Sequence, residues 1–466
     1  MTVVRVVDII PADRSDEAGL NWQPSIAVNP DNPDQIVITT TDVPEPPNVG
    51  FWYSLDRGAT WQVNFSEPGN EMDQSVALAA SGELYWAVAS DTPSKDPTLH
   101  VLRTPGLVTS GPFPDIDTPL RDMIDQPYAL AITHRQSGQA DKDRTYVAYI
   151  EHDDWNDSAA ATIDVCLDAR AASPVFVTVA LNHRASVPLD GYEVRPCVHS
   201  DGTAYLAYKG WRSYNDPFVI TDIVVERDDS WGSGGFVDLK DPSDNKPGRL
   251  VAKSVKIKDP QDLANQRLDN DLSLAVDPTN SDIVYLVWGD NAGPNYTLRV
   301  RRSLDRGATW CPDLFTVVNA NLACLAINSD GRVGFMYQQL VSGRWETHFR
   351  RTTDATGKNW DDIILARTAI PADDVADYSR VISVGRDFYG VFPAWNTPDP
   401  ANFPATPPAA SNPNGATFLR HTTTSPPWKL VDASGQKVNE SVDPFFYLIL
   451  DENTVEPPTG LTGTPH

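Results

Sequence analysis

The chain has 466 residues, with 63 acidic and 37 basic side chains and a formal net charge of −26. A protein this acidic is repelled by phosphate backbones and anionic lipids, so we expect no nucleic-acid binding and no membrane insertion. The sequence contains no apolar run of about 18 residues, and residues 1–10 resemble a strand rather than a signal peptide. We therefore expect a soluble protein that is intracellular, particle-associated or exported by a route other than the general secretory one.

Residues 3–10 are predicted to form a strand, and a unit of four short strands follows at 25–28, 36–40, 51–54 and 61–65. The last turn of this unit, Ser54-Leu-Asp-Arg-Gly-Ala-Thr-Trp61, returns unchanged as residues 303–310. Its aspartate can accept backbone N–H bonds across a tight turn, while glycine supplies a positive φ and tryptophan begins the next strand. An exact repeat at two distant places predicts a repeat architecture.

Similar units follow along the rest of the chain. Their inner strands are expected to begin near residues 75, 127, 196, 272, 322 and 380, and the sixth unit ends in a related turn, 352–360, with one extra residue before Gly357. In the seventh unit we predict third and fourth strands at 418–422 and 428–431. Each four-stranded unit must bury its faces against its neighbours, which predicts an all-β, seven-bladed β-propeller. Eight blades or six blades remain alternatives.

Residues 1–450 are predicted to form this single domain, with strands 3–10 and 445–450 closing the ring between the first and last blades. Residues 451–466 form a tail rich in proline and glycine. We expect this tail to lie against the propeller or against a neighbouring chain.

The repeated turn is the Asp-box motif, and the chain resembles the sialidase-like (BNR-repeat) β-propellers. The resemblance implies that the boxes are folding elements away from the ligand face, with tryptophans buried between strands. The residues assigned to this structural role are Ser54, Asp56, Gly58, Thr60, Trp61, Ser303, Asp305, Gly307, Thr309, Trp310, Asp354, Gly357 and Trp360.

Polar residues precede the inner strands, and in a propeller these strand starts converge on the axis at one mouth of the channel. The candidate ligand-binding residues there are Gln23, Gln74, Gln126, Arg195, Asp271, Arg380 and Asp443. Carboxylates crowded beside arginines can acquire separated pKa values, as glycoside hydrolysis requires, but polar groups also cap strand ends at any channel mouth. Both interpretations remain open here.

Sialidases carry an arginine before the first inner strand, where this chain has Gln23-Pro24-Ser25. Losing that arginine removes one bidentate contact with a substrate carboxylate. We therefore favour a non-catalytic module that recognises a glycan or protein partner. The alternatives are an exo-sialidase, with Tyr378 as nucleophile, Asp73 or Asp125 as acid and Glu193 as a further catalytic candidate, or a structural subunit of a larger particle.

No cofactor is expected from the sequence. The acidic turns 29–34 and 277–282 admit Ca²⁺ as a minor alternative, although proline and asparagine at those positions are more typical of a hydrogen-bonded turn. The four cysteines lack metal spacing and are predicted to be reduced thiols, with a Cys311–Cys324 disulfide as the alternative.

Overall fold

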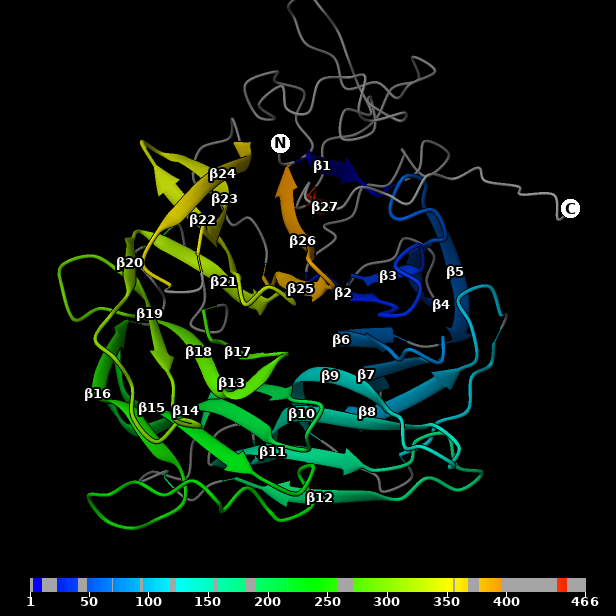
Figure 1. The fold of residues 1–466 in the computed structure, drawn as a ribbon, viewed down its shortest axis with the longest axis horizontal. Coiled ribbons are helices and arrows are strands. Elements are labelled where there is room, and N and C mark those ends of the chain that lie inside the picture. The colour runs from blue at the N-terminus through cyan, green and yellow to red at the C-terminus, as the bar shows by residue number, and fades with distance from the viewer. Residues whose placement is uncertain are drawn as a thin grey trace, which may run out of the picture.

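The fold is known from a computed structural model, which describes residues 3–10, 23–40, 48–68, 70–92, 95–109, 111–117, 123–154, 158–181, 184, 190–215, 217–258, 263, 271–354, 357–367, 377–395 and 442–450. Within these ranges every regular element is a β-strand, and the strands form seven antiparallel sheets. The sheets stand around a central axis as the blades of a propeller (Figure 1). The prediction of seven blades is confirmed, and the alternatives of six and eight blades are wrong.

Each blade is numbered along the chain, and its strands are given from the axis outward. The first contains β2 (Ser25–Val28), β3 (Ile36–Thr39), β4 (Asn48–Ser54) and β5 (Gln62–Pro68), and the second contains β6 (Asn70–Leu78), β7 (Leu84–Thr92) and β8 (Lys95–Thr104). The third contains β9 (Ile124–His134), β10 (Lys142–Asp154), β11 (Ser158–Cys166) and β12 (Phe176–Ala180), and the fourth contains β13 (Asp190–Val198), β14 (Ala204–Asn215), β15 (Phe218–Asp228) and β16 (Arg249–Lys258).

The fifth blade contains β17 (Ser273–Asp277), β18 (Asn280–Asp290), β19 (Thr297–Ser303) and β20 (Phe315–Val318). The sixth contains β21 (Ala320–Ile327), β22 (Val333–Val341), β23 (Arg344–Thr352) and β24 (Trp360–Arg367). The seventh contains β25 (Arg380–Val384), β26 (Asp387–Trp395), β27 (Val442–Leu450) and β1 (Val3–Asp8).

The seventh blade joins the two ends of the described chain. The N-terminal strand β1 pairs antiparallel with β27, from Val3 opposite Leu450 to Asp8 opposite Phe445. Thus β27 takes the third place in this sheet and β1 the fourth, which are the places expected for residues 418–422 and 428–431. Those two predicted strands lie outside the described residues.

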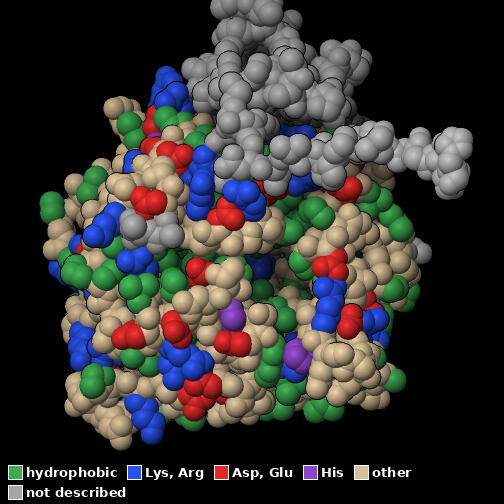
Figure 2. All heavy atoms as spheres, viewed as in Figure 1, with side chains coloured by type: hydrophobic (Ala, Val, Ile, Leu, Met, Phe, Trp, Pro, Cys, Tyr) green, Lys and Arg blue, Asp and Glu red, His purple; other side chains and the backbone are tan. Residues whose placement is uncertain are grey.

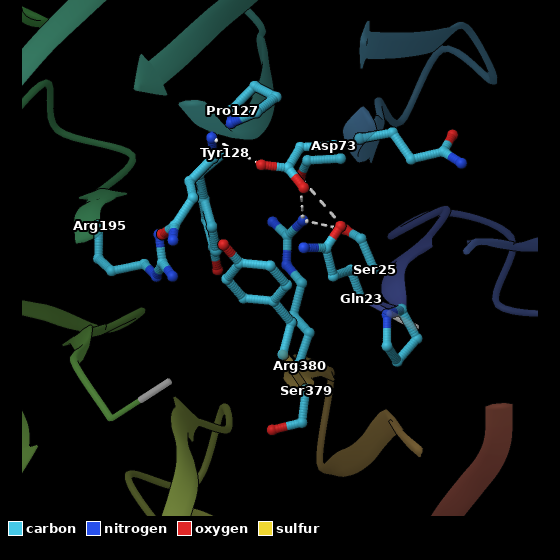
Figure 3. Close-up of a pocket in the computed structure, with 13 residues that line it drawn as sticks. Gln23, Ser25, Asp73, Pro127, Tyr128, Arg195, Ser379 and Arg380 are labelled. Atoms are coloured by element: carbon cyan, nitrogen blue, oxygen red, sulfur yellow. Dashed lines mark hydrogen bonds between the residues drawn. The ribbon is translucent and has the colours of Figure 1, made fainter. Parts of the chain in front are cut away.

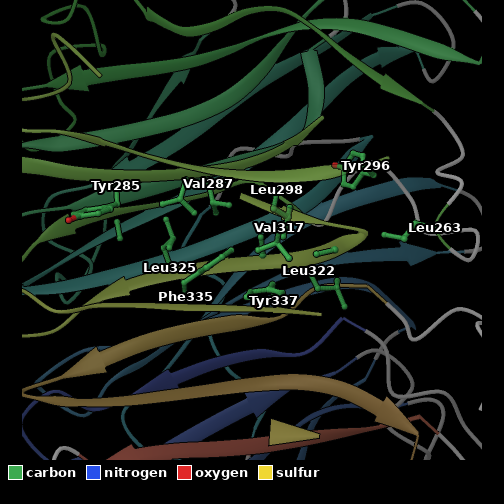
Figure 4. Packing of buried hydrophobic residues seen from close by; sticks show 14 of the residues in the cluster. Leu263, Tyr285, Val287, Tyr296, Leu298, Val317, Leu322, Leu325, Phe335 and Tyr337 are labelled. Carbon is green, nitrogen blue, oxygen red and sulfur yellow. The ribbon is translucent and has the colours of Figure 1, made fainter. Parts of the chain in front are cut away.

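Neighbouring blades hold together through apolar layers between their faces. Between the fifth and sixth blades, Tyr285 and Val287 of β18 pack in one cluster with Phe335 and Tyr337 of β22, all at most 2% exposed (Figure 4). Alternate residues of a strand point to opposite faces, so a central strand buried on both sides must be apolar throughout. Strand β18 meets this condition between Val284 and Trp288, a run that is entirely buried.

Serine hydroxyls add hydrogen bonds between neighbouring inner strands. Ser25 accepts the N–H of Val76 at 3.4 Å, Ser75 accepts that of Ala129 at 3.1 Å, and Ser273 accepts that of Leu325 at 3.0 Å. Each bond joins one blade to the next near the start of an inner strand. These serines help fix the spacing of the blades around the axis.

The repeated octapeptide forms the same hydrogen-bonded turn at both of its places. In the first, Asp56 Oδ1 accepts the N–H of Thr60 at 2.8 Å, its Oδ2 accepts the Thr60 hydroxyl at 2.6 Å, and Ser54 Oγ accepts the N–H of Gly58 at 2.8 Å. The second turn has the same three distances through Asp305, Thr309, Ser303 and Gly307. In the turn before β24, the amide of Asn359 replaces the threonine hydroxyl and donates to Asp354 Oδ2 at 2.7 Å.

The tryptophans of these turns are not equally buried, contrary to expectation. Trp61 is 9% exposed and its ring lies 5.3 Å from that of Phe446, whereas Trp310 and Trp360 are only partly buried. All three indoles donate to the carbonyl of the turn glycine at 3.0–3.2 Å. The hydrogen bond is therefore intrinsic to the turn, while burial depends on what the adjacent blade supplies.

Candidate functional site

The chain enters several inner strands through a strained backbone. Gln23, Gln126, Leu322 and Tyr378 each have φ between 54° and 60°, in the left-handed region that side chains other than glycine rarely adopt. The pairing register shifts beside two of these residues, Gln126 and Leu322, as in a β-bulge. Bulges and strained residues re-aim side chains and are common at functional sites. Three of the four strained residues, Gln23, Gln126 and Tyr378, line one cavity on the axis.

This cavity has a volume of about 40 Å³ and is lined by residues at the starts of β2 and β25 and within β6, β9 and β13, so that five blades contribute to it (Figure 3). It brings together the predicted site residues Gln23, Asp73, Gln74, Gln126, Arg195, Tyr378 and Arg380. Glu193 lines a smaller cavity beside it, together with Tyr378 and Arg195. The repeated turns follow third strands, which run parallel to the inner strands, so they lie at the opposite ends of the blades.

Arg380 forms the floor of the cavity and connects four blades. It extends from β25, and its Nη1 donates to Ser25 Oγ at 3.1 Å, Ser75 Oγ at 3.3 Å and the carbonyl of Val76 at 3.0 Å (Figure 3). Nη2 donates to the carbonyl of Ala129 at 2.9 Å. Beneath this side chain a wider cavity of about 420 Å³ continues along the axis between the inner strands. Arg380 and Tyr128 line both cavities and so separate them.

Two tyrosine rings and a second arginine form one wall. The Arg195 guanidinium lies 5.1 Å from the ring centre of Tyr128 and 5.8 Å from that of Tyr378, and Arg380 lies 4.3 Å from the Tyr128 ring. Arginine over a tyrosine face is an attractive cation–π arrangement. Arg195 also donates to Glu193 Oε1 at 3.2 Å, which fixes its position from behind.

Behind this wall is a buried cluster of charges between the fourth and fifth blades. Lys209 Nζ lies 2.8 Å from Glu193 Oε2 and also contacts Asp271, which accepts the hydroxyl of Tyr296. Burial alone would raise the pKa of Glu193, but Lys209 and Arg195 outweigh it and hold that pKa below its ordinary value. Burial raises the pKa of Asp271 well above its ordinary value, and Glu193 adds to the effect while Lys209 opposes it. Asp271 is fully buried and does not line the cavity.

Four of the predicted site residues do not line the axial cavity, and one of them, Glu193, lines the smaller cavity beside it. Asp271 belongs to the buried cluster, Asp443 is 1% exposed in β27, and Asp125 is half-buried in β9. Gln74 lines the cavity, but its amide is engaged by the carbonyl of Thr40 and, at 2.7 Å, by the indole N–H of Trp86.

Sequence reasoning missed Ser25, Ser75, Tyr128, Ser379 and Lys209. The first four lie one or two residues after predicted site residues, so the polar pattern at the inner strands contained a signal for them.

The acidic turns are hydrogen-bonded within themselves. Asn29 Oδ1 accepts the N–H groups of Asp31 and Asn32, and Asp277 Oδ1 accepts the N–H and hydroxyl of Thr279. Among the described residues no group of three or more histidine, cysteine, aspartate or glutamate side chains is placed to hold a metal ion. All four cysteines are free, so the alternative Cys311–Cys324 disulfide is absent from the structure.

The face of the molecule drawn in Figure 2 is mixed in charge. On the face drawn in Figure 2, acidic and basic side chains lie among one another, outside the grey atoms, without a broad field of one sign. No helix in the described part of the chain is long and apolar enough to cross a membrane.

Comparison with known proteins gives structural likeness only. No protein-family model matches the chain, and no curated protein matches it in sequence. Among solved structures, it is similar to a Dyadobacter fermentans protein of unknown function (11% identity, TM-score 0.47, 96% of this chain and 99% of that one). It is also similar to a PL25 ulvan lyase, with 9% identity and a TM-score of 0.48 over 83% of this chain and 93% of that one. A third similar structure is the Hadza microbial sialidase Hz136, with 15% identity and a TM-score of 0.43 over 71% of this chain and 65% of that one. At such identities and TM-scores these likenesses assign neither a family nor a function to this chain.

Proposed function

We propose that this protein is a carbohydrate-recognition propeller that binds the end of a glycan in the axial cavity and does not catalyse a reaction of that glycan. The observation that carries the proposal is the lining of that cavity, where amide, carboxylate and hydroxyl groups from different blades surround two tyrosine faces. Fixed polar groups at such a site select the pattern of hydroxyls on a sugar. Inner strands locked by Arg380 and the serines supply a preorganised site.

Our expectation that the protein does not turn the glycan over is supported by how two buried carboxyls are engaged. Most glycosidases need a protonated acid beside the scissile bond and a second, ionised carboxylate. Asp271 is fully buried and is bonded to Lys209 and Tyr296. Glu193 is fixed by Arg195, Lys209 and the N–H of Leu272 at 3.1 Å.

A glycan array followed by calorimetry tests the proposal. We expect retention of a restricted set of glycans, and loss of binding when Gln23 or Asp73 is replaced by alanine. Asp305→Ala, at the opposite end of a blade, is the control and should bind normally once its fold is verified. Failure of every glycan to bind would refute the proposed function.

A second candidate is the exo-sialidase chemistry suggested by the resemblance, because Tyr378, Arg195 and Arg380 line one cavity. It is tested with a fluorogenic sialoside. We expect no turnover above background, and turnover that disappears in Tyr378→Phe would replace our proposal with this one.

A further inference from the structure

The arginines of the cavity are not arranged to clamp a carboxylate. Nη1 and Nη2 of Arg380 already donate to two serines and two backbone carbonyls. Its Nε has no partner, but the atom is buried and so offers no surface to a ligand. Arg195 is 7% exposed and donates to Glu193 and to the carbonyl of Val194. Bidentate recognition of a carboxylate uses a pair of parallel N–H groups of one guanidinium, and in both arginines the two terminal nitrogens already donate to acceptors within the protein.

The carboxylate of the cavity, in contrast, has room to accept a hydrogen bond. Asp73 is half-buried, and its Oδ2 accepts the N–H of Gln126 at 3.0 Å. No other hydrogen bond from the described residues reaches this carboxylate. A ligand group placed against it must therefore donate, and an ionised acid there would be repelled.

Cationic ligands are also disfavoured. Arg195 and Arg380 line the same cavity, and their guanidinium groups already occupy faces of the Tyr128 and Tyr378 rings. An ammonium group would meet two fixed positive charges and would find those cation–π positions taken. Groups that donate without carrying charge, such as hydroxyls, avoid both penalties.

The size of the cavity limits how much of a ligand it holds. A volume of about 40 Å³ corresponds to roughly three water molecules, at about 10–15 Å³ for each. Two or three hydroxyls on one edge of a sugar ring replace that much water.

From these contacts we infer that the axial cavity takes the hydroxyl-bearing edge of one uncharged sugar ring and discriminates against acidic sugars. The inference rests on the proposed glycan-binding function and specifies its ligand class. The discriminating residue is Asp73, because its carboxylate can accept a hydrogen bond from a hydroxyl and repels an ionised acid at the same position.

Matched sugar pairs test this directly. Methyl glucoside is compared with methyl glucuronide, and methyl galactoside with methyl galacturonide, since each pair differs only at carbon 6; sialic acid is added as a further acid. The dissociation constants are measured by calorimetry at pH 7 with the full chain. We expect the neutral member of any pair that binds to bind at least about tenfold more tightly, as expected for one unfavourable charge contact at a partly exposed site.

Asp73→Asn removes the charge while keeping the shape of the side chain. It should reduce the ratio of the dissociation constants of the acidic and the neutral sugar to about threefold or less. Asp305→Asn, far from the cavity, should leave the ratio unchanged. An acidic sugar that binds as tightly as its neutral partner, or a ratio unaffected by Asp73→Asn, would overturn the inference while leaving glycan binding intact. Absence of binding by any sugar or array glycan would instead refute the proposed function, and the inference with it.

Discussion

The two ends of the blades are stabilised by different kinds of network. At one end, the side-chain hydrogen bonds that close each repeated turn join residues two to four positions apart, such as Asp56 with Thr60. At the channel mouth, Arg380 bonds to residues 251–355 positions away in the sequence. The turns therefore form wherever their sequence occurs, whereas the mouth exists only once the ring has closed. Scaffold and site are thus separated along the blades.

Of the substitutions considered, replacing the buried tryptophan of the first turn should lower the free energy of unfolding most. Trp61→Ala is expected to lower the free energy of unfolding by about 3–5 kcal/mol, because it leaves a void against Phe446. Trp310→Ala in the identical turn should lower it by about half as much, since Trp310 is only partly buried. Denaturant unfolding of both variants checks this, and equal losses would show that the turn rather than its surroundings sets the energy.

Removing Arg380 breaks the network at the mouth. Arg380→Ala should lower the free energy of unfolding by about 2–4 kcal/mol, because buried carbonyls of Val76 and Ala129 lose their donor. Arg135→Ala is the control, since this arginine forms an exposed ion pair with Asp31 and should change stability little. If the two variants unfold alike, Arg380 does not tie the blades together.

The sequence predicts the turn end of the molecule better than the mouth. Asp56, Gly58 and Thr60 interact within one motif, so their roles follow from spacing and turn chemistry. Lys209 shows the opposite case, because nothing in its strand indicates that Glu193 and Asp271 meet it between two blades. Strands 3–10 and 445–450 are predicted to close the ring, but their pairing with each other within the seventh blade joins residues more than 430 positions apart and has no local signal. Local motifs fix local geometry, but distant pairings depend on the whole ring.

The turn aspartates should make stability depend on pH. Burial alone would raise the pKa of Asp305, but hydrogen bonds from Thr309 and Ser303 outweigh it and lower that pKa. The ionised carboxylate therefore stabilises the fold fully above its unfolded pKa of about 3.9, and this contribution disappears as the pH falls through the folded value.

Asp305→Asn should remove about 1 kcal/mol at pH 7, on the scale of a capping aspartate, and should flatten the dependence of unfolding free energy on pH below about 4. Urea titrations between pH 2.5 and pH 7 measure both effects. An acid dependence as steep as that of the wild type would exclude this carboxylate as a source of it.

The central claim, that the mouth and not the opposite end recognises a glycan, is tested most directly by calorimetric titration of one array-selected glycan into four proteins. These are the wild type, Asp73→Ala, Gln23→Ala and the control Asp305→Ala, each verified to be folded. We predict that both mouth variants lose binding while the control retains the affinity of the wild type. Unchanged binding by the two mouth variants would contradict the account.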